Sequence, residues 1–176
     1  MKRIFFFILG LLSVPAINAL DFAKEYEIKA AFLINLASFV TWPERHFTSN
    51  QAPFHICILG EDPFGIGLDI LAKDRYIDKH PIEIRRFNAL EQAYTCEILF
   101  ISPSKQQDTL IIFRQLKRYP ILTVGDTQDF VVTGGMIQFF IQHNRVRLMV
   151  DSQSLRDVDL HPSSQLMLVA QPIERH

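Results

Sequence analysis

The chain contains 176 residues, of which 48% are hydrophobic, and its 18 basic and 19 acidic side chains give a formal net charge of −1. Nucleic-acid binding normally requires a basic patch or stripe, so this near-neutral balance argues against nucleic acid as a partner. The length suits one domain with a single hydrophobic core.

The N-terminus has the three parts of a secretory signal peptide. A basic start at residues 2–3 precedes the apolar run Ile4–Val14, and a suitable cleavage site ends at Ala19. An uncleaved membrane anchor is the alternative, although the apolar run is shorter than the ~20 residues that a membrane-spanning helix needs. We therefore expect residues 1–19 to be removed on export and residues 20–176 to form one domain.

The segment Lys29–Pro43 (KAAFLINLASFVTWP) is apolar on nearly every side. A soluble helix normally carries one apolar stripe about 100° wide, so this helix must be covered by its own domain, by a partner or by lipid. The apolar part is too short to span a bilayer. We expect one face to lie on a sheet and the other to contact a second copy or a membrane protein. The residues predicted for that contact are Leu33, Ala37, Phe39 and Trp42.

Strands and helices alternate along the middle of the chain, as in βαβ units that build a parallel sheet covered on both faces. The predicted strands are 54–59, 82–86, 98–101 and 121–124. The helices between them are 63–72, 89–94 and a longer one that opens at residues 102–104 and ends before Pro120. The inner face of the longer helix is assigned to Leu110, Ile111, Phe113 and Leu116, with Ile112 as an optional fifth member.

This alternation breaks after Gly125. A polar loop is expected over Asp126–Thr133, followed by strands at 136–141 and 146–150 that join around His143-Asn144, and by a closing helix at 163–170. The predicted fold is an α/β three-layer sandwich, with a mixed but mostly parallel sheet, a C-terminal β-hairpin and flanking helices.

Cys57 and Cys96 are the only two cysteines. Outside the cytoplasm, an isolated even pair tends to form a disulfide, which here would close a loop of about 40 residues and stabilise the fold by roughly 4 kcal/mol. A redox enzyme would need the CxxC spacing, which is missing. Two free buried thiols are the alternative.

No motif for catalysis or metal binding stands out. None of the six histidines has the spacing of a zinc site, and the GxSxG, GxGxxG and P-loop patterns are absent. His55 is expected to be a half-exposed strand residue on the same face as Cys57. We predict no catalytic residue, no metal ligand and no cofactor.

The carboxyl edge of the sheet is a candidate ligand site, because open α/β sheets bind ligands there. Gly60 and Asp62 follow one predicted strand, and Asp126 follows another. No second carboxylate can be paired with Asp126. A small-molecule sensor or binding module is therefore the alternative function drawn from this edge.

Seven segments occur in the order found in one known family. They are KAAFLINLASFVTWP, CILGEDPFG, CEILFIS, ILTVGD, GGMIQFF, VRLMVDSQSL and SSQLMLVA. Together they cover the chain from Lys29 to Ala170, and this ordered set resembles the YfiR family of exported bacterial proteins.

The resemblance implies a periplasmic regulator, not an enzyme, with an α/β fold that can dimerise. Such proteins restrain an inner-membrane diguanylate cyclase by contacting its periplasmic region, and an outer-membrane lipoprotein relieves the restraint. The resemblance therefore implies these partners, a possible homodimer, and control of cyclic di-GMP signalling and of biofilm formation.

The same resemblance bears on individual residues. Cys57 and Cys96 stand in the CxLG and CxILF contexts of the family's cysteine pair, which implies that they form its disulfide. A second bridge found in some relatives cannot form, because no further cysteine exists. Asp151 stands where asparagine is more usual, and residues 159–163 replace a usual Gly-Leu segment. These departures bear on the partner's identity more than on the fold.

Overall fold

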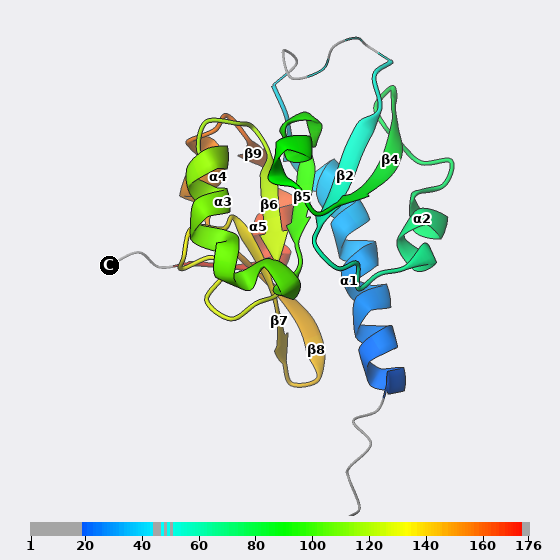
Figure 1. Cartoon of the computed structure of the whole chain (residues 1–176), viewed down its shortest axis with the longest axis vertical. Coiled ribbons are helices and arrows are strands. Elements are labelled where there is room, and N and C mark those ends of the chain that lie inside the picture. The colour runs from blue at the N-terminus through cyan, green and yellow to red at the C-terminus, as the bar shows by residue number, and fades with distance from the viewer. Residues whose placement is uncertain (1–18, 44–46, 48, 50, 174–176) are drawn as a thin grey trace, which may run out of the picture.

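The computed structural model describes residues 19–43, 47, 49 and 51–173, and it shows one large sheet between two layers of helices (Figure 1). The α-helices are α1 (Ala19–Phe39), α2 (Ile66–Ala72), α3 (Thr109–Leu116), α4 (Ser152–Arg156) and α5 (Ser164–Val169). The 3₁₀ helices are η2 (Leu90–Thr95) and η3 (Pro103–Asp108). The strands are β1 (Val40–Thr41), β2 (Phe54–Leu59), β3 (Tyr76–Ile77), β4 (His80–Phe87), β5 (Ile98–Ile101), β6 (Leu122–Gly125), β7 (Ile137–Gln142), β8 (Arg145–Val150), β9 (His161–Pro162) and β10 (Ala170–Pro172).

The large sheet has eight strands in the order β10-β8-β7-β6-β5-β2-β4-β3. Strands β4, β2, β5, β6 and β7 run parallel to one another, whereas β8 forms an antiparallel hairpin with β7 and β3 is antiparallel to β4. Strand β1 pairs with β9 in a separate two-stranded sheet. The predicted α/β class with a mixed, mostly parallel sheet is thus confirmed.

Two hydrophobic cores lie on the two faces of the sheet. Alternate side chains of the central strands enter opposite cores, as the pleat requires. Ile56 and Phe100 belong to the core under α1, α2, α4 and α5, whereas Cys57 and Leu99 belong to the core under η2 and α3. The unbroken apolar runs of β2 and β5 reflect this burial on both faces.

Helix α1 is longer than the sequence suggested. The apolar helix was expected over Lys29–Pro43, whereas α1 begins at Ala19 and ends at Phe39. The charged residues before Lys29 belong to the helix, because no glycine or proline interrupts its span. Residues 1–18 lie outside the described residues, so the signal peptide stays a prediction.

The inner face assigned to α3 was partly wrong. Leu110 and Ile111 are exposed, Phe113 is partly buried, and the side chains that reach the core are Ile112 and Leu116. The segment starts as the 3₁₀ helix η3, which has three residues per turn and so shifts the phase of the faces relative to a continuous α-helix. Counting an α-helical period from residue 102 therefore assigns the wrong side chains to the buried face of α3.

The loop after Gly125 was expected to be polar, but it contains a buried aromatic side chain, Phe130. Phe130 is buried between two glycines and meets the ring of Phe113 edge-on, with the ring centroids 5.2 Å apart. A Cβ atom added at Gly125 or Gly135 would lie 2.4 or 2.2 Å from this ring. Both positions thus need glycine because the ring approaches the backbone so closely.

The C-terminal part contains the predicted hairpin and helix, together with short elements that the sequence did not reveal. His143 and Asn144 have φ angles of 50° and 56°, which suit the two-residue turn of a hairpin. Asp151 is the N-cap of the unpredicted α4 and accepts the backbone N–H groups of Gln153 and Ser154, each at 3.2 Å. Aspartate is as good an N-cap as asparagine, so this departure preserves the local structure.

Candidate functional site

Asp126 lies at the carboxyl end of β6, where the sequence predicted a ligand edge, but its partners come from α1. One carboxylate oxygen, Oδ2, accepts hydrogen bonds from the Tyr26 hydroxyl and from Lys29 Nζ, both at 2.6 Å. Lys29 also pairs with Glu25, one turn earlier. The side chains of Lys29 and Asp126 are each only 4% exposed. Helix α1 therefore occupies this part of the edge.

Burial of this cluster has an electrostatic consequence for its tyrosine. Burial raises the pKa of Tyr26 above its ordinary value, and the hydrogen bond to Asp126 and the charge of that carboxylate raise it further. The phenol therefore stays neutral and keeps donating its proton. The other oxygen of Asp126, Oδ1, is buried without a hydrogen-bond partner among the described residues. The arrangement holds α1 against the sheet.

Asp62, the second predicted residue of this edge, is also engaged within the chain. Its Oδ2 atom accepts a hydrogen bond from Arg86 Nε at 2.6 Å, and its Oδ1 atom accepts the Phe64 N–H at 2.8 Å. Arg86 further pairs with Asp69 at 2.5 Å. These contacts join the end of β4 to the start of α2.

Protein also fills the point where the strand order reverses, between β2 and β5. Gly60 has a φ angle of 98°, and an added Cβ would lie 2.4 Å from Ser104 Oγ. The same Ser104 hydroxyl accepts the Glu61 N–H at 2.9 Å. The interpretation of Gly60, Asp62 and Asp126 as a ligand site is therefore corrected, because neighbouring residues occupy the positions that a ligand would take.

The Arg86 cluster predicts a dependence of stability on acid. The hydrogen bond from Arg86 lowers the pKa of Asp69, so the pair stabilises the fold above the ordinary aspartate pKa and loses its effect as pH falls through the lowered value. Arg86→Ala is expected to reduce the free energy of unfolding at pH 7 by about 1 kcal/mol, since the pair is partly exposed.

Urea denaturation at several pH values measures this effect. The difference between wild type and Arg86→Ala should shrink as pH falls below about 4, while Arg75→Ala, which truncates an exposed arginine, should change little throughout. A difference that stays constant down to pH 2 would contradict the assigned role of Asp69.

The predicted disulfide between Cys57 and Cys96 is confirmed. The bond joins Cys57 in β2 to Cys96, which lies just before β5. It spans a sequence separation of 39, and both cysteines are completely buried.

The expectation of a half-exposed His55 was wrong. This side chain is largely buried, its Nδ1 atom donates to the Thr95 carbonyl at 3.0 Å, and the buried Glu97 accepts its backbone N–H.

The apolar face of α1 that was expected to contact a partner lies inside the domain. Leu33 and Ala37 are 0% and 1% exposed, Trp42 is also buried, and Phe39 is partly buried. The sheet lies below the helix, and α2 and α5 pack beside it. A charged substitution at Leu33 or Ala37 would therefore perturb the core and could not report on an outer surface.

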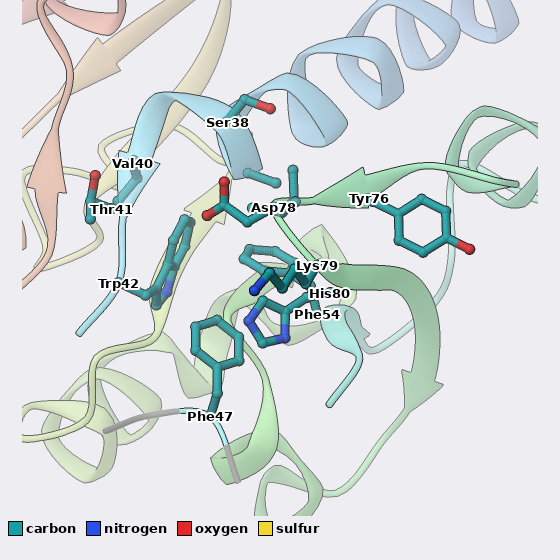
Figure 2. A pocket seen from close by; sticks show the side chains of 12 residues that line it. Ser38, Val40, Thr41, Trp42, Phe47, Phe54, Tyr76, Asp78, Lys79 and His80 are labelled. Atoms are coloured by element: carbon teal, nitrogen blue, oxygen red, sulfur yellow. The ribbon is translucent and has the colours of Figure 1, made fainter. Parts of the chain in front are cut away.

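A cavity lies at the opposite edge of the sheet, where β2 and β4 begin (Figure 2). Its volume is about 740 Å³, and its walls come from the end of α1, β1, β2 and the turn between β3 and β4. Sequence reasoning missed it, because the contributing segments are far apart in the chain. The antiparallel pairing of β3 with β4 places the turn between them beside the end of α1 and the start of β2.

The structure describes residues 19–43, 47, 49 and 51–173 of the chain. In that part of the chain, no group of three or more His, Cys, Asp or Glu side chains is arranged to hold a metal ion. No helix described there is long and apolar enough to cross a membrane.

Comparison with known proteins identifies the family. A search of curated proteins gives no match. Residues 26–171, which span nearly the whole described domain, match the YfiR/HmsC-like family. This match covers the filled carboxyl edge, the disulfide and the cavity. The chain therefore belongs to the YfiR/HmsC-like family.

Proposed function

We propose that this protein is a periplasmic regulator that binds the periplasmic region of an inner-membrane diguanylate cyclase and restrains its activity. Membership of the YfiR/HmsC-like family over residues 26–171 is the observation that carries this proposal. The proposed partners are the cyclase, an outer-membrane lipoprotein that releases it, and a second copy of the chain.

Two structural features support a regulatory role outside the cytoplasm. A buried disulfide suits an oxidising compartment, as expected for an exported protein. The polar groups at the carboxyl edge, where α/β enzymes usually place their chemistry, hold α1 and α2 in position. These groups serve the fold, which favours a protein that acts by binding.

A partner would have to use exposed side chains, since the inward residues of α1 are unavailable. Large apolar side chains are exposed on several elements, and aromatic or aliphatic anchors of this kind commonly supply binding energy at interfaces. The most exposed are Leu168 on α5, Ile66 and Ile70 on α2, Val132 in the turn before β7, and Tyr76 on β3.

Deletion of the gene in its native host is expected to raise cyclic di-GMP and surface attachment, because the cyclase would lose its restraint. Cyclic di-GMP extracted from the deletion strain and quantified by mass spectrometry is the measurement. Restoring the gene should return the level to normal, and deleting the cyclase as well should abolish the increase. Unchanged cyclic di-GMP in a strain with an active cognate cyclase would disprove the proposal.

A small-molecule sensor or binding module is the second candidate function. The cavity of about 740 Å³ favours it, since small-molecule sites in proteins typically enclose about 300–1,000 Å³. This site would lie at the amino edge of the parallel strands rather than at the carboxyl edge. The two functions are compatible, because a ligand could modulate a regulator.

A further inference from the structure

We propose that the cavity at the amino edge of the sheet binds a saccharide without net charge, of about the size of a disaccharide. This assignment goes beyond the regulatory function and does not depend on it. It rests on the aromatic wall of the cavity, on the polar side chains that enter it, and on its volume (Figure 2).

Aromatic rings form one wall of the cavity. Trp42 and Phe54 meet edge to face with centroids 4.9 Å apart, and Phe47 stacks on His80 with centroids 4.0 Å apart. Trp42 is 7% exposed and its indole Nε1 atom already donates to the Glu97 carbonyl, so the part of this side chain that meets the cavity is apolar. The negative face of such a ring attracts polarised C–H groups, of which one face of a pyranose has several.

The polar groups come from the β3–β4 turn. In Figure 2 the side chains of Asp78 and Lys79 reach into the space between Trp42 and His80. His80 Nδ1 donates to the Ala52 carbonyl at 2.6 Å, which leaves Nε2 as its remaining polar atom. The site thus combines a strong acceptor, a strong donor and an imidazole nitrogen.

This combination selects a ligand class by its charge. An anion would be attracted by Lys79 but repelled by Asp78, and a simple cation would meet the reverse arrangement. Sugar hydroxyl groups both donate and accept hydrogen bonds, so an uncharged sugar satisfies both side chains at once. A volume of about 740 Å³ exceeds what a single amino acid needs and leaves room for two sugar rings.

The sequence supplies its own reporter for the test, because Trp42 is the only tryptophan and lines the cavity. Cellobiose and N,N′-diacetylchitobiose, which do not fluoresce, would be titrated separately into the full domain while tryptophan emission is recorded. At least one of them is expected to change the emission in a saturable way. No change with either sugar up to its solubility limit would overturn the proposal.

Substitutions at the rim locate the binding. Lys79→Ala and Asp78→Gly should each weaken binding about tenfold, since each removes a hydrogen bond to a charged group. The matched controls are Lys73→Ala and Asp74→Gly, two exposed charges of the preceding loop that do not line the cavity. Glycine suits both aspartate positions, whose φ angles are 54° and 56°.

Two further outcomes would refute the assignment. Equal binding by the rim variants and by their controls would place the sugar elsewhere on the protein. A response to phenylalanine, a zwitterion that is itself only weakly fluorescent, with none to either disaccharide, would assign the cavity to another ligand class. Melting temperatures of all four variants would verify that each one is folded.

Discussion

Replacing Lys29 with methionine is expected to lower the free energy of unfolding by about 3–5 kcal/mol, because it leaves the carboxylate of Asp126 buried without its cation. Methionine has a similar length and a good helix propensity, so neither cavity formation nor loss of helicity should account for the change. Urea denaturation followed by circular dichroism gives the free energy directly.

The double variant separates loss of the ion pair from damage to the helix. Adding Asp126→Asn to Lys29→Met removes the unpaired charge and keeps an acceptor for the Tyr26 hydroxyl, so much of the lost stability should return. Lys24→Met, which replaces an exposed lysine of the same helix, should change stability by less than about 0.5 kcal/mol. A single and a double variant of equal stability would contradict the assigned role of the pair.

Removing the disulfide is expected to cost about 4 kcal/mol, since the bridge closes a loop defined by a sequence separation of 39. Cys57→Ala with Cys96→Ala avoids leaving a free thiol in the core. Thermal and urea denaturation of this variant should show the loss, and the same denaturation in the presence of a reductant should show a smaller difference from wild type.

The disulfide also offers a test that bears on regulation. If control of the cyclase needs the link between β2 and the start of β5, the double alanine variant should raise cyclic di-GMP in the complemented deletion strain. An amount of folded protein equal to wild type, measured by immunoblotting of the soluble fraction, is the required control. Unchanged stability together with unchanged cyclase control would reject both roles of the bridge.

The sequence predicts the central strands well, because burial on both faces of the sheet produces short unbroken runs of apolar residues that are uncommon in other structures. The segments FHICIL and ILFI correspond to β2 and β5 with the bounds expected. The prediction of the buried face of α3 failed because the number of residues per helical turn changes where the 3₁₀ helix η3 passes into α3. Prediction also failed for the two-residue strands, whose pairing depends on tertiary contacts and leaves no pattern in the sequence.

The functional residues were predicted less well than the fold, because their surroundings depend on how distant segments pack together. The apolar excess of α1 suggested a partner, but the domain itself encloses Leu33 and Ala37 on all sides. Asp126 suggested a ligand edge, but its partners lie about 100 residues earlier in α1. The cavity combines Trp42 with the turn at Asp78 and Lys79, and no spacing rule connects those positions.

The pairing of β1 with β9 has a consequence for how the chain folds. Val40 pairs with Pro162, and the Ser163 N–H donates to the Phe39 carbonyl at 2.7 Å, so the end of α1 is fixed by residues near the opposite end of the chain. Such distant contacts carry a large loop-closure entropy and form slowly. Helix α1 is synthesised well before β9, yet its C-terminal end can reach its final position only after β9 is available.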